Sequence, residues 1–312
     1  MNKLATLSAI TALSFSSLMA DNHEQSMKFS AQEVSPGIHM LMGVGGFTGG
    51  NVGVLVGSDG VIMIDDAMPS SLEILQQAIV SVTDRPIDYL INTHVHGDHT
   101  GNNVTFKQQG AAIVAHENLR QHLLNKGIPK GKEMVQAPKD MLPVITFASS
   151  MTFHLNGQDA ALVHLPHAHT DGDAIIHFSP ANVIHTGDIF FNGMFPFIDV
   201  NSGGSAQGYL AAQKAILERS DAKTQIIPGH GPLAKKADLA AAVSMLEDSI
   251  EIVERLIAAG KTEDEVVKLN PLSKYHDKWN WGFITTERMT RQLYKSLSHN
   301  NQHAHNDTPH HH

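Results

Sequence analysis

Short apolar segments alternate with helical patterns along the chain and predict an α/β protein. Residues 38–42, 52–56 and 61–64 are apolar stretches separated by glycines, which is typical of a β-meander. Residues 70–82 place apolar side chains at helical spacing after a serine that can cap the helix. Further strands are predicted at 87–91, 112–115, 144–147, 151–155 and 160–165, with a short helix at 102–110. This succession indicates layered sheets and helices, and the later strands imply a second sheet.

The carboxy-terminal third is predicted to be helical. An apolar stripe from Leu239 to Ile257 ends just before Gly260, a residue that commonly terminates helices. Thr262 and Glu265 have the spacing of a capping box for a short following helix. A last helix is predicted at 286–297. Residues 298–312 are polar and histidine-rich, without apolar side chains to pack, so they are predicted to be a disordered tail.

The first twenty residues have the pattern of a secretory signal peptide. Lys3 supplies a positive charge, an apolar, serine- and threonine-containing segment follows, and Ala20 is small enough for cleavage before Asp21. The sequence therefore predicts a signal peptide at 1–20, one catalytic domain at 21–297 and a periplasmic or secreted protein. An uncleaved amino-terminal anchor is the alternative, because Leu18 is an imperfect residue three places before the cut, although no stable membrane anchor is expected.

The composition limits the catalytic groups and the partners that this chain can use. The 312 residues include no cysteine, which excludes disulfides, thiolate metal ligands and thiol nucleophiles. The formal net charge of -9 argues against nucleic acid as a partner, since phosphate backbones are bound by cationic surfaces. Catalysis must then use histidine, carboxylate, serine or a metal-bound water.

The run from Thr93 to Gly101 points to metal binding. It contains His94, His96, Asp98 and His99 directly after a predicted strand. Imidazole nitrogen and carboxylate oxygen are ligands that Zn²⁺ prefers, and the run is too dense for a single ion. In an extended segment His94 and His96 point to one face. A turn opened by Gly97 can direct Asp98 and His99 toward a second ion.

Three later segments present similar groups at strand ends. The sequence LPHAHTDGD at 165–173 offers His169, with His167 as the competing candidate. Residues 183–188 end in Asp188, which taken alone would be an ordinary turn residue, and His185 is expected to be a core or supporting residue. A buried strand at 226–227 leads to His230, which alone is a weak signal.

Together these motifs resemble the metallo-β-lactamase superfamily, in particular its dinuclear hydrolase branch and exported bacterial β-lactamase-like hydrolases. The resemblance implies an αββα sandwich, with two mixed β-sheets packed face to face and helices on the outer faces. It also favours His169 over His167. The implied ligands are His94, His96 and His169 for metal 1, and Asp98, His99 and His230 for metal 2, with Asp188 bridging. The metals would be two Zn²⁺, with Mn²⁺ or Fe²⁺ possible because Asp188 stands where many β-lactamases have cysteine.

The implied activity is hydrolysis of an amide or lactam, a lactone or another ester by a metal-bridging hydroxide. Asp98 would be catalytic, because it would orient that hydroxide. A glyoxalase II-like thioesterase is the alternative, although no glutathione-binding pattern is recognised. Two further hypotheses are a non-catalytic metal-binding protein and a di-iron redox protein. The iron proteins of this fold typically carry a carboxylate at the position of His96 and a flavin domain, and this chain has neither.

Charge and position suggest features of the substrate. Two divalent ions, two aspartates and a hydroxide leave one positive charge, so a small molecule bearing a carboxylate is expected to be the substrate. Asn192 is the expected substrate contact, and Asp65, Asp66, Asp171 and Asp173 are candidates to orient the histidine rings. The glycine-rich loop 43–50, with Phe47 at its tip, either folds over a site or is an ordinary flexible turn. The lysine-rich segment 125–140 is predicted to be a surface loop.

Overall fold

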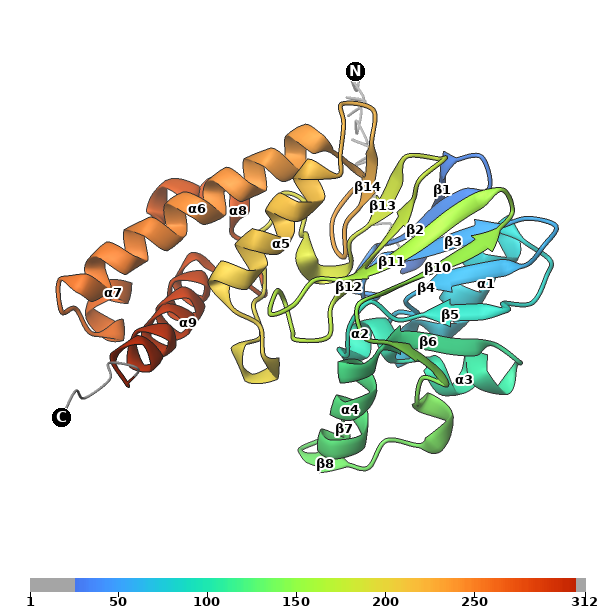
Figure 1. Cartoon of the computed structure of the whole chain (residues 1–312), viewed down its shortest axis with the longest axis horizontal. Helices are drawn as coiled ribbons and strands as arrows, with labels where there is room; N and C mark the ends of the chain where they lie inside the picture. The colour runs from blue at the N-terminus through green and yellow to red at the C-terminus, as the bar shows by residue number, and fades with distance from the viewer. Residues whose placement is uncertain (1–25, 307–312) are drawn as a thin grey trace, which may run out of the picture.

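The computed structural model describes residues 26–306, and its centre is a pair of mixed β-sheets (Figure 1). The first sheet has the strand order β1-β2-β3-β4-β5-β6-β9 and the second β10-β11-β12-β13-β14-β15. The strands of the first are β1 (Lys28–Ser35), β2 (Ile38–Val44), β3 (Val52–Val56), β4 (Val61–Ile64), β5 (Tyr89–Ile91), β6 (Ala112–His116) and β9 (Ile145–Phe147). Those of the second are β10 (Ser150–Leu155), β11 (Gln158–His164), β12 (Ala174–Phe178), β13 (Val183–His185), β14 (Gln225–Ile227) and β15 (Ala234–Lys235).

Helices cover the outer faces of both sheets. The helices α2 and α4 and the hairpin β7-β8 occupy connections near the ends of the strands, whereas α8 lies with α6 in the helical layer (Figure 1). The helices are α1 (Leu72–Val82), α2 (Gly97–Thr100), α3 (Asn103–Gln108), α4 (Glu117–Lys126), α5 (Ala206–Glu218), α6 (Lys236–Ala258), α7 (Glu263–Leu269), α8 (His276–Trp279) and α9 (Thr286–Asn306). The hairpin strands are β7 (Ile128–Lys130) and β8 (Glu133–Val135). Within the described residues, no helix combines the length and apolarity needed to cross a membrane.

Strand β4 shows how the sequence produces layers. All of its side chains are buried, and they alternate between two apolar clusters because successive side chains of a strand face opposite ways. Ile62 and Ile64 lie in the cluster between the two sheets, while Val61 and Met63 lie in the cluster that includes Leu75 of α1. The predicted αββα arrangement is confirmed.

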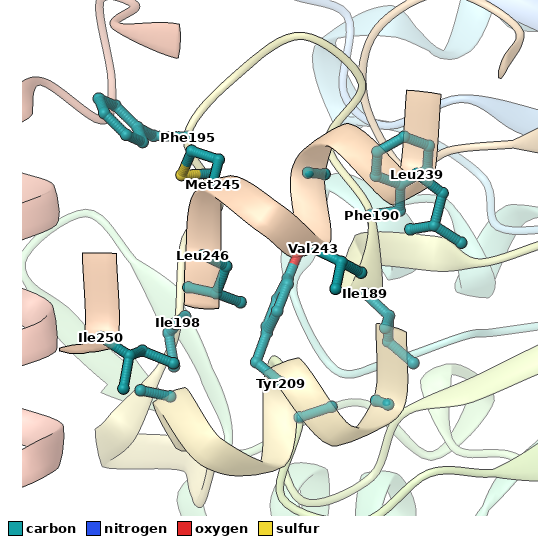
Figure 2. Packing of buried hydrophobic residues seen from close by; sticks show 14 of the residues in the cluster. Ile189, Phe190, Phe195, Ile198, Tyr209, Leu239, Val243, Met245, Leu246 and Ile250 are labelled. Atoms are coloured by element: carbon teal, nitrogen blue, oxygen red, sulfur yellow. The ribbon is translucent and has the colours of Figure 1, made fainter. Parts of the chain in front are cut away.

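A third cluster packs α5, α6 and α9 against the outer face of the second sheet. Figure 2 shows Tyr209 of α5 among Ile189, Ile198 and Val243. The Tyr209 hydroxyl donates to the carbonyl of Asp188 at 2.7 Å, so this helix layer fixes the turn after β13. Gln213, also on α5, donates to the carbonyl of Ile189 at 3.0 Å. The sequence pattern did not predict α5.

Several other expectations differ from the structure at their boundaries. The helix predicted at 286–297 continues to Asn306, so residues 298–306 are helical and the prediction of a disordered tail was wrong for them. Segment 125–140 is not one irregular loop, because it contains β7 and β8, and α4 and β1 were also missed. The capping box of α7 is confirmed, with the Thr262 hydroxyl accepting from the backbone of Glu265. The predicted signal peptide at 1–20 and the last tail residues, 307–312, lie outside the described residues.

Candidate metal centre

The site lies where strands of both sheets end. β5 leads into the loop and short helix α2 that carry His94, His96, Asp98 and His99. β11, β13 and β14 run in the same direction, so their carboxyl ends meet at one edge of the second sheet. The two sheets are joined there by backbone hydrogen bonds, from Ala174 to the Thr93 carbonyl at 2.9 Å and from Asn51 to the Gly229 carbonyl at 2.7 Å.

The seven predicted ligands come together in two adjacent groups. One contains His94, His96, His169 and Asp188, and the other contains Asp98, His99 and His230. Within each group, one ligand atom from every residue lies within 4.8 Å of the others. The sequence therefore predicted which side chains converge.

Asp188 lies between the groups and turns one oxygen toward each. Its Oδ2 is 3.7 Å from Nε2 of His94 and 3.5 Å from Nε2 of His169. Its Oδ1 is 3.1 Å from Nε2 of His99 and 3.4 Å from Nε2 of His230. Gly229 makes this approach possible, because a Cβ at that position would collide with Asp188 Oδ1. A carboxylate with this orientation can bridge two cations.

Unpaired atoms indicate that the groups are suited to cations. Nε2 of His94, Nε2 of His99 and Oδ1 of Asp188 are buried without a hydrogen-bond partner, although buried polar atoms are normally paired. A metal ion at each group would satisfy them with nitrogen and oxygen ligands suited to Zn²⁺. The donor set therefore fits a dinuclear metal site.

Electrostatics in the site follow from burial and from the crowding of charges. Burial alone would raise the pKa of Asp188, but the surrounding His99, His230 and His94 hold it well below its usual range. Burial likewise disfavours charge on His230, yet Asp188 and Asp98 raise its pKa to about 9. For His169, burial and the neighbouring His96 lower the pKa to about 4. The carboxylates and histidines of the site thus strongly shift one another's pKa values even without a bound ion.

His94, His96, His99 and His169 each have a contact at the ring nitrogen that does not face the two groups. Nδ1 of His99 lies 2.8 Å from Asp65 Oδ2, and Nε2 of His96 lies 2.9 Å from Asp199 Oδ2. Nδ1 of His169 is 2.8 Å from the Phe197 carbonyl, and Nδ1 of His94 is 3.0 Å from the Thr93 hydroxyl. These contacts fix ring orientation and leave the opposite nitrogen facing the groups.

Of the four aspartates proposed to orient histidines, Asp65 alone contacts a ring of the two groups. The Asp66 carboxylate accepts from the backbone of Asn102, and Asp171 pairs with His122. Asp173 accepts from Thr170, which anchors the loop carrying His169. The contact of Asp199 with His96 was missed. Asp199 lies shortly before a Ser-Gly-Gly sequence that indicates a turn, and nothing in this context predicts a contact with His96.

The remaining candidates lie away from the groups. His167 is exposed and its ring contacts the Gly203 carbonyl, so it is not part of either group. His185 is buried in the core outside both groups. Asn192 does not line the cavity over the site; its side-chain amide donates to the Pro232 carbonyl at 3.0 Å and stabilises the turn after β14.

A cavity of about 1010 Å³ opens over the two groups. His96, Asp98, Asp188 and His230 form part of its wall. Phe47, at the tip of loop 43–50, also lines the cavity and stacks on the His230 ring at 5.9 Å between centroids. The loop therefore folds over the site, which decides between the two interpretations of its sequence.

Comparisons with known proteins agree with this architecture. Residues 45–230 match the model of the metallo-beta-lactamase superfamily. A curated relative, the Beta-lactamase-like protein 2 homolog of Caenorhabditis elegans, is 24% identical over 238 residues, which cover 75% of this chain and 66% of that protein. The chain thus spans just under two thirds of the relative's length.

Solved structures share the fold at low sequence identity. The metallo-beta-lactamase from Pontibacter korlensis has a TM-score of 0.59 and 16% identity, covering 71% of this chain and 100% of that chain. The stereoselective inverting sec-alkylsulfatase Pisa1 from Pseudomonas sp. has a TM-score of 0.64 and 15% identity, covering 90% of this chain but 52% of that one. Since the family match includes every residue of the two groups, this chain belongs to the metallo-β-lactamase superfamily.

Proposed function

We propose that the protein is an exported dizinc hydrolase that cleaves an amide or lactam, a lactone or another ester in a small molecule. The observation that carries the proposal is Asp188, whose two oxygens face two groups of buried nitrogen and oxygen ligands with unpaired atoms. A carrier of metal needs neither a bridging carboxylate nor a large cavity over the metal groups. A dinuclear hydrolase acting on a small molecule would use both.

Two bound Zn²⁺ would supply a water of lowered pKa as nucleophile and would polarise the scissile carbonyl. The residues of the protein would hold the ions and orient the ligand side chains. His94, His96 and His169 would bind the first ion, His99, His230 and Asp98 the second, and Asp188 both. Their supporting contacts at Asp65, Asp199, Thr93 and the Phe197 carbonyl would keep the histidines in the tautomer that metal binding requires.

Asp98 is suited to orient the attacking water. Its side chain is 20% exposed and lines the cavity, and its Oδ2 lies 3.4 Å from Nε2 of His230. Burial would raise the pKa of Asp98, but His99 and His230 lower it to about 2. The carboxylate is therefore ionised at neutral pH and can accept a hydrogen bond from a water beside it.

The first experiment measures metal content and substrate class together. Zinc-loaded protein is assayed against a β-lactam, a lactone, a simple ester, a thioester and a phosphodiester, and zinc is quantified after desalting. We expect about two zinc ions per chain and turnover of one of the carboxyl-derived substrates. Preference for the thioester would support the glyoxalase II-like alternative.

His96→Ala should abolish the activity that appears, with a loss of at least about a thousandfold. His167→Ala is the matched control, because His167 belongs to neither group and should leave turnover unchanged. Full turnover in His96→Ala would refute the mechanism. Export is tested separately, by finding whether the protein isolated from the periplasm or medium begins at Asp21.

A further inference from the structure

The cavity over the metal groups has an almost wholly apolar wall. Among the described residues, the groups themselves contribute four polar side chains to it, and the one other polar side chain is Thr100, whose hydroxyl already donates to the His96 carbonyl at 3.0 Å. Among the described residues that line it, none is lysine or arginine. A substrate carboxylate would therefore find no lysine or arginine among the described lining residues, and its attraction would have to come from the metal groups.

An arc of aromatic rings runs from one group to the other along this wall. Phe191 stacks on His230 at 4.9 Å between centroids, and Trp281 follows at 6.1 Å from Phe191. Phe283 lies 5.6 Å from Trp281 and 5.5 Å from Phe197. Phe197 then stacks on His96 at 5.8 Å, which closes the arc.

Aliphatic side chains from the other connections complete the wall. They come from the connection after β4, from the segments around α2, α3 and α4, from the start of β7 and from the turn before β9. Met68, Val95, Val104, Leu123, Ile128 and Met141 line the cavity there. The volume, about 1010 Å³, is at the upper end of the roughly 300–1,000 Å³ of small-molecule sites. The space is therefore larger than a short acyl group requires.

The rim of the cavity is apolar as well. The side chains of Phe47 and Phe283 are 58% and 45% exposed, although both line the cavity. Exposed large apolar residues at the edge of a pocket mark a site for an apolar ligand more than a structural need. The Arg288 guanidinium lies 4.0 Å from the Phe283 ring centroid and 5.5 Å from that of Phe197, and Arg288 does not line the cavity.

We infer that the substrate is uncharged and carries a long apolar acyl or alkyl group, which occupies this wall while the scissile bond lies over the metal groups. This inference rests on the proposed hydrolase function and specifies its substrate class. Each methylene group buried from water can raise binding up to about fourfold, so recognition would grow with chain length.

The test uses zinc-loaded full-length protein and a series of p-nitrophenyl esters with acyl chains from acetyl to decanoyl. We expect kcat/KM to rise at least about tenfold from the butanoyl to the octanoyl ester. An octanoyl-length ester that ends in a carboxylate should be at least about tenfold poorer than the octanoyl ester itself. Equal rates across the series, or a preference for the carboxylate, would overturn the inference while leaving hydrolysis established.

Two variants test whether a change in chain-length preference comes from the cavity wall or from a general loss of folding. Phe283→Ser should flatten the dependence on chain length, and its partial exposure makes the change tolerable for the fold. Val80→Ser is the control, because Val80 is 73% exposed on α1 and does not line the cavity. A variant of Phe283 that keeps the full chain-length preference would count against the aromatic arc as the binding wall.

Failure of the function is distinguishable from failure of this inference. If no ester is hydrolysed, binding of the neutral fluorescent probe N-phenyl-1-naphthylamine is measured on the same protein. Probe binding that 1-decanol displaces, and that Phe283→Ser weakens several-fold, supports an apolar site although ester hydrolysis has failed. Absence of probe binding overturns the inference.

Discussion

The two sides of the candidate metal centre are supported differently. On the side of the first sheet, His99 contacts Asp65, and both side chains are completely buried. On the side of the second sheet, His96 contacts Asp199, and these side chains are 23% and 15% exposed. Asp65 follows β4 directly, whereas Asp199 begins the short turn Val200–Ser202 in a long connection. One support is part of the core, and the other belongs to a loop.

This difference indicates that the support of His99 is more rigid than the support of His96. Asp65 also accepts from the Thr93 backbone at 2.7 Å and the Thr93 hydroxyl at 2.8 Å, so one carboxylate holds two neighbouring parts of the site. Its backbone is left-handed, with φ 60°, and so is that of Ala67 at φ 63°. Such strain persists where surrounding contacts determine the conformation, and it is common at functional sites. Water can replace part of what Asp199 does, but it cannot reach Asp65.

The largest effect is expected from Asp65→Asn. An amide nitrogen facing Nδ1 of His99 would favour the tautomer with its proton on Nε2, the nitrogen that faces the second group. We expect zinc affinity at that group to fall about 100-fold, measured by competition with a chelator. Asp66→Asn is the matched control: Asp66 is equally buried, but its carboxylate accepts from the Asn102 backbone and contacts no ring of the two groups. Equal zinc affinity in the two variants would contradict the role of Asp65.

A smaller effect is expected from Asp199→Asn. Because Asp199 and His96 are partly exposed, the amide can rotate or a water can accept from the ring, so the tautomer is less strictly fixed. We expect zinc affinity at the first group to fall about tenfold, by the same chelator competition. Asp159→Asn provides the control, since Asp159 pairs with His154 in an exposed position away from the site. A loss as large as that of Asp65→Asn would remove the proposed difference between the two sides.

The same contrast explains how much the sequence could predict. His94, His96, Asp98 and His99 lie in one run after a strand, so their convergence requires only local geometry. The alternating burial of β4 likewise follows from strand periodicity. Both can be predicted from sequence.

Asp199 could not be predicted, because its partner His96 is 103 residues away and its contact depends on how a long connection crosses the sheet edge. Asn192 failed for a related reason: its position between two motifs suggested the cavity, but the turn after β14 uses its amide. Helix α5 was missed because its apolar residues do not form a clear stripe in the sequence. Its contact with the carbonyl of Asp188 depends on the tertiary fold. The four rings of the aromatic arc come from two connections far apart in the sequence, one after β13 and one after α8, so it too depends on the fold.

The smallest effect concerns pH and the loop that carries His169. Burial raises the pKa of Asp173 to about 7, even though Thr170 donates to both of its oxygens. Because this folded-state pKa lies above the unfolded value of 3.8, the folded protein binds the proton more tightly. Its contribution to stability is complete below the unfolded pKa and is lost as the pH rises to about 7. The loop on the second-sheet side should therefore weaken toward alkaline pH.

Asp173→Asn measures this contribution, because the amide cannot ionise. Between about pH 6 and about pH 8, the free energy of unfolding of the native protein should fall by about 1 kcal/mol more than that of the variant, measured by urea denaturation. The exposed Asp84→Asn should behave like the native protein. If Asp173→Asn retains the full pH dependence, the loss of stability arises elsewhere, and the loop that carries His169 is not its source.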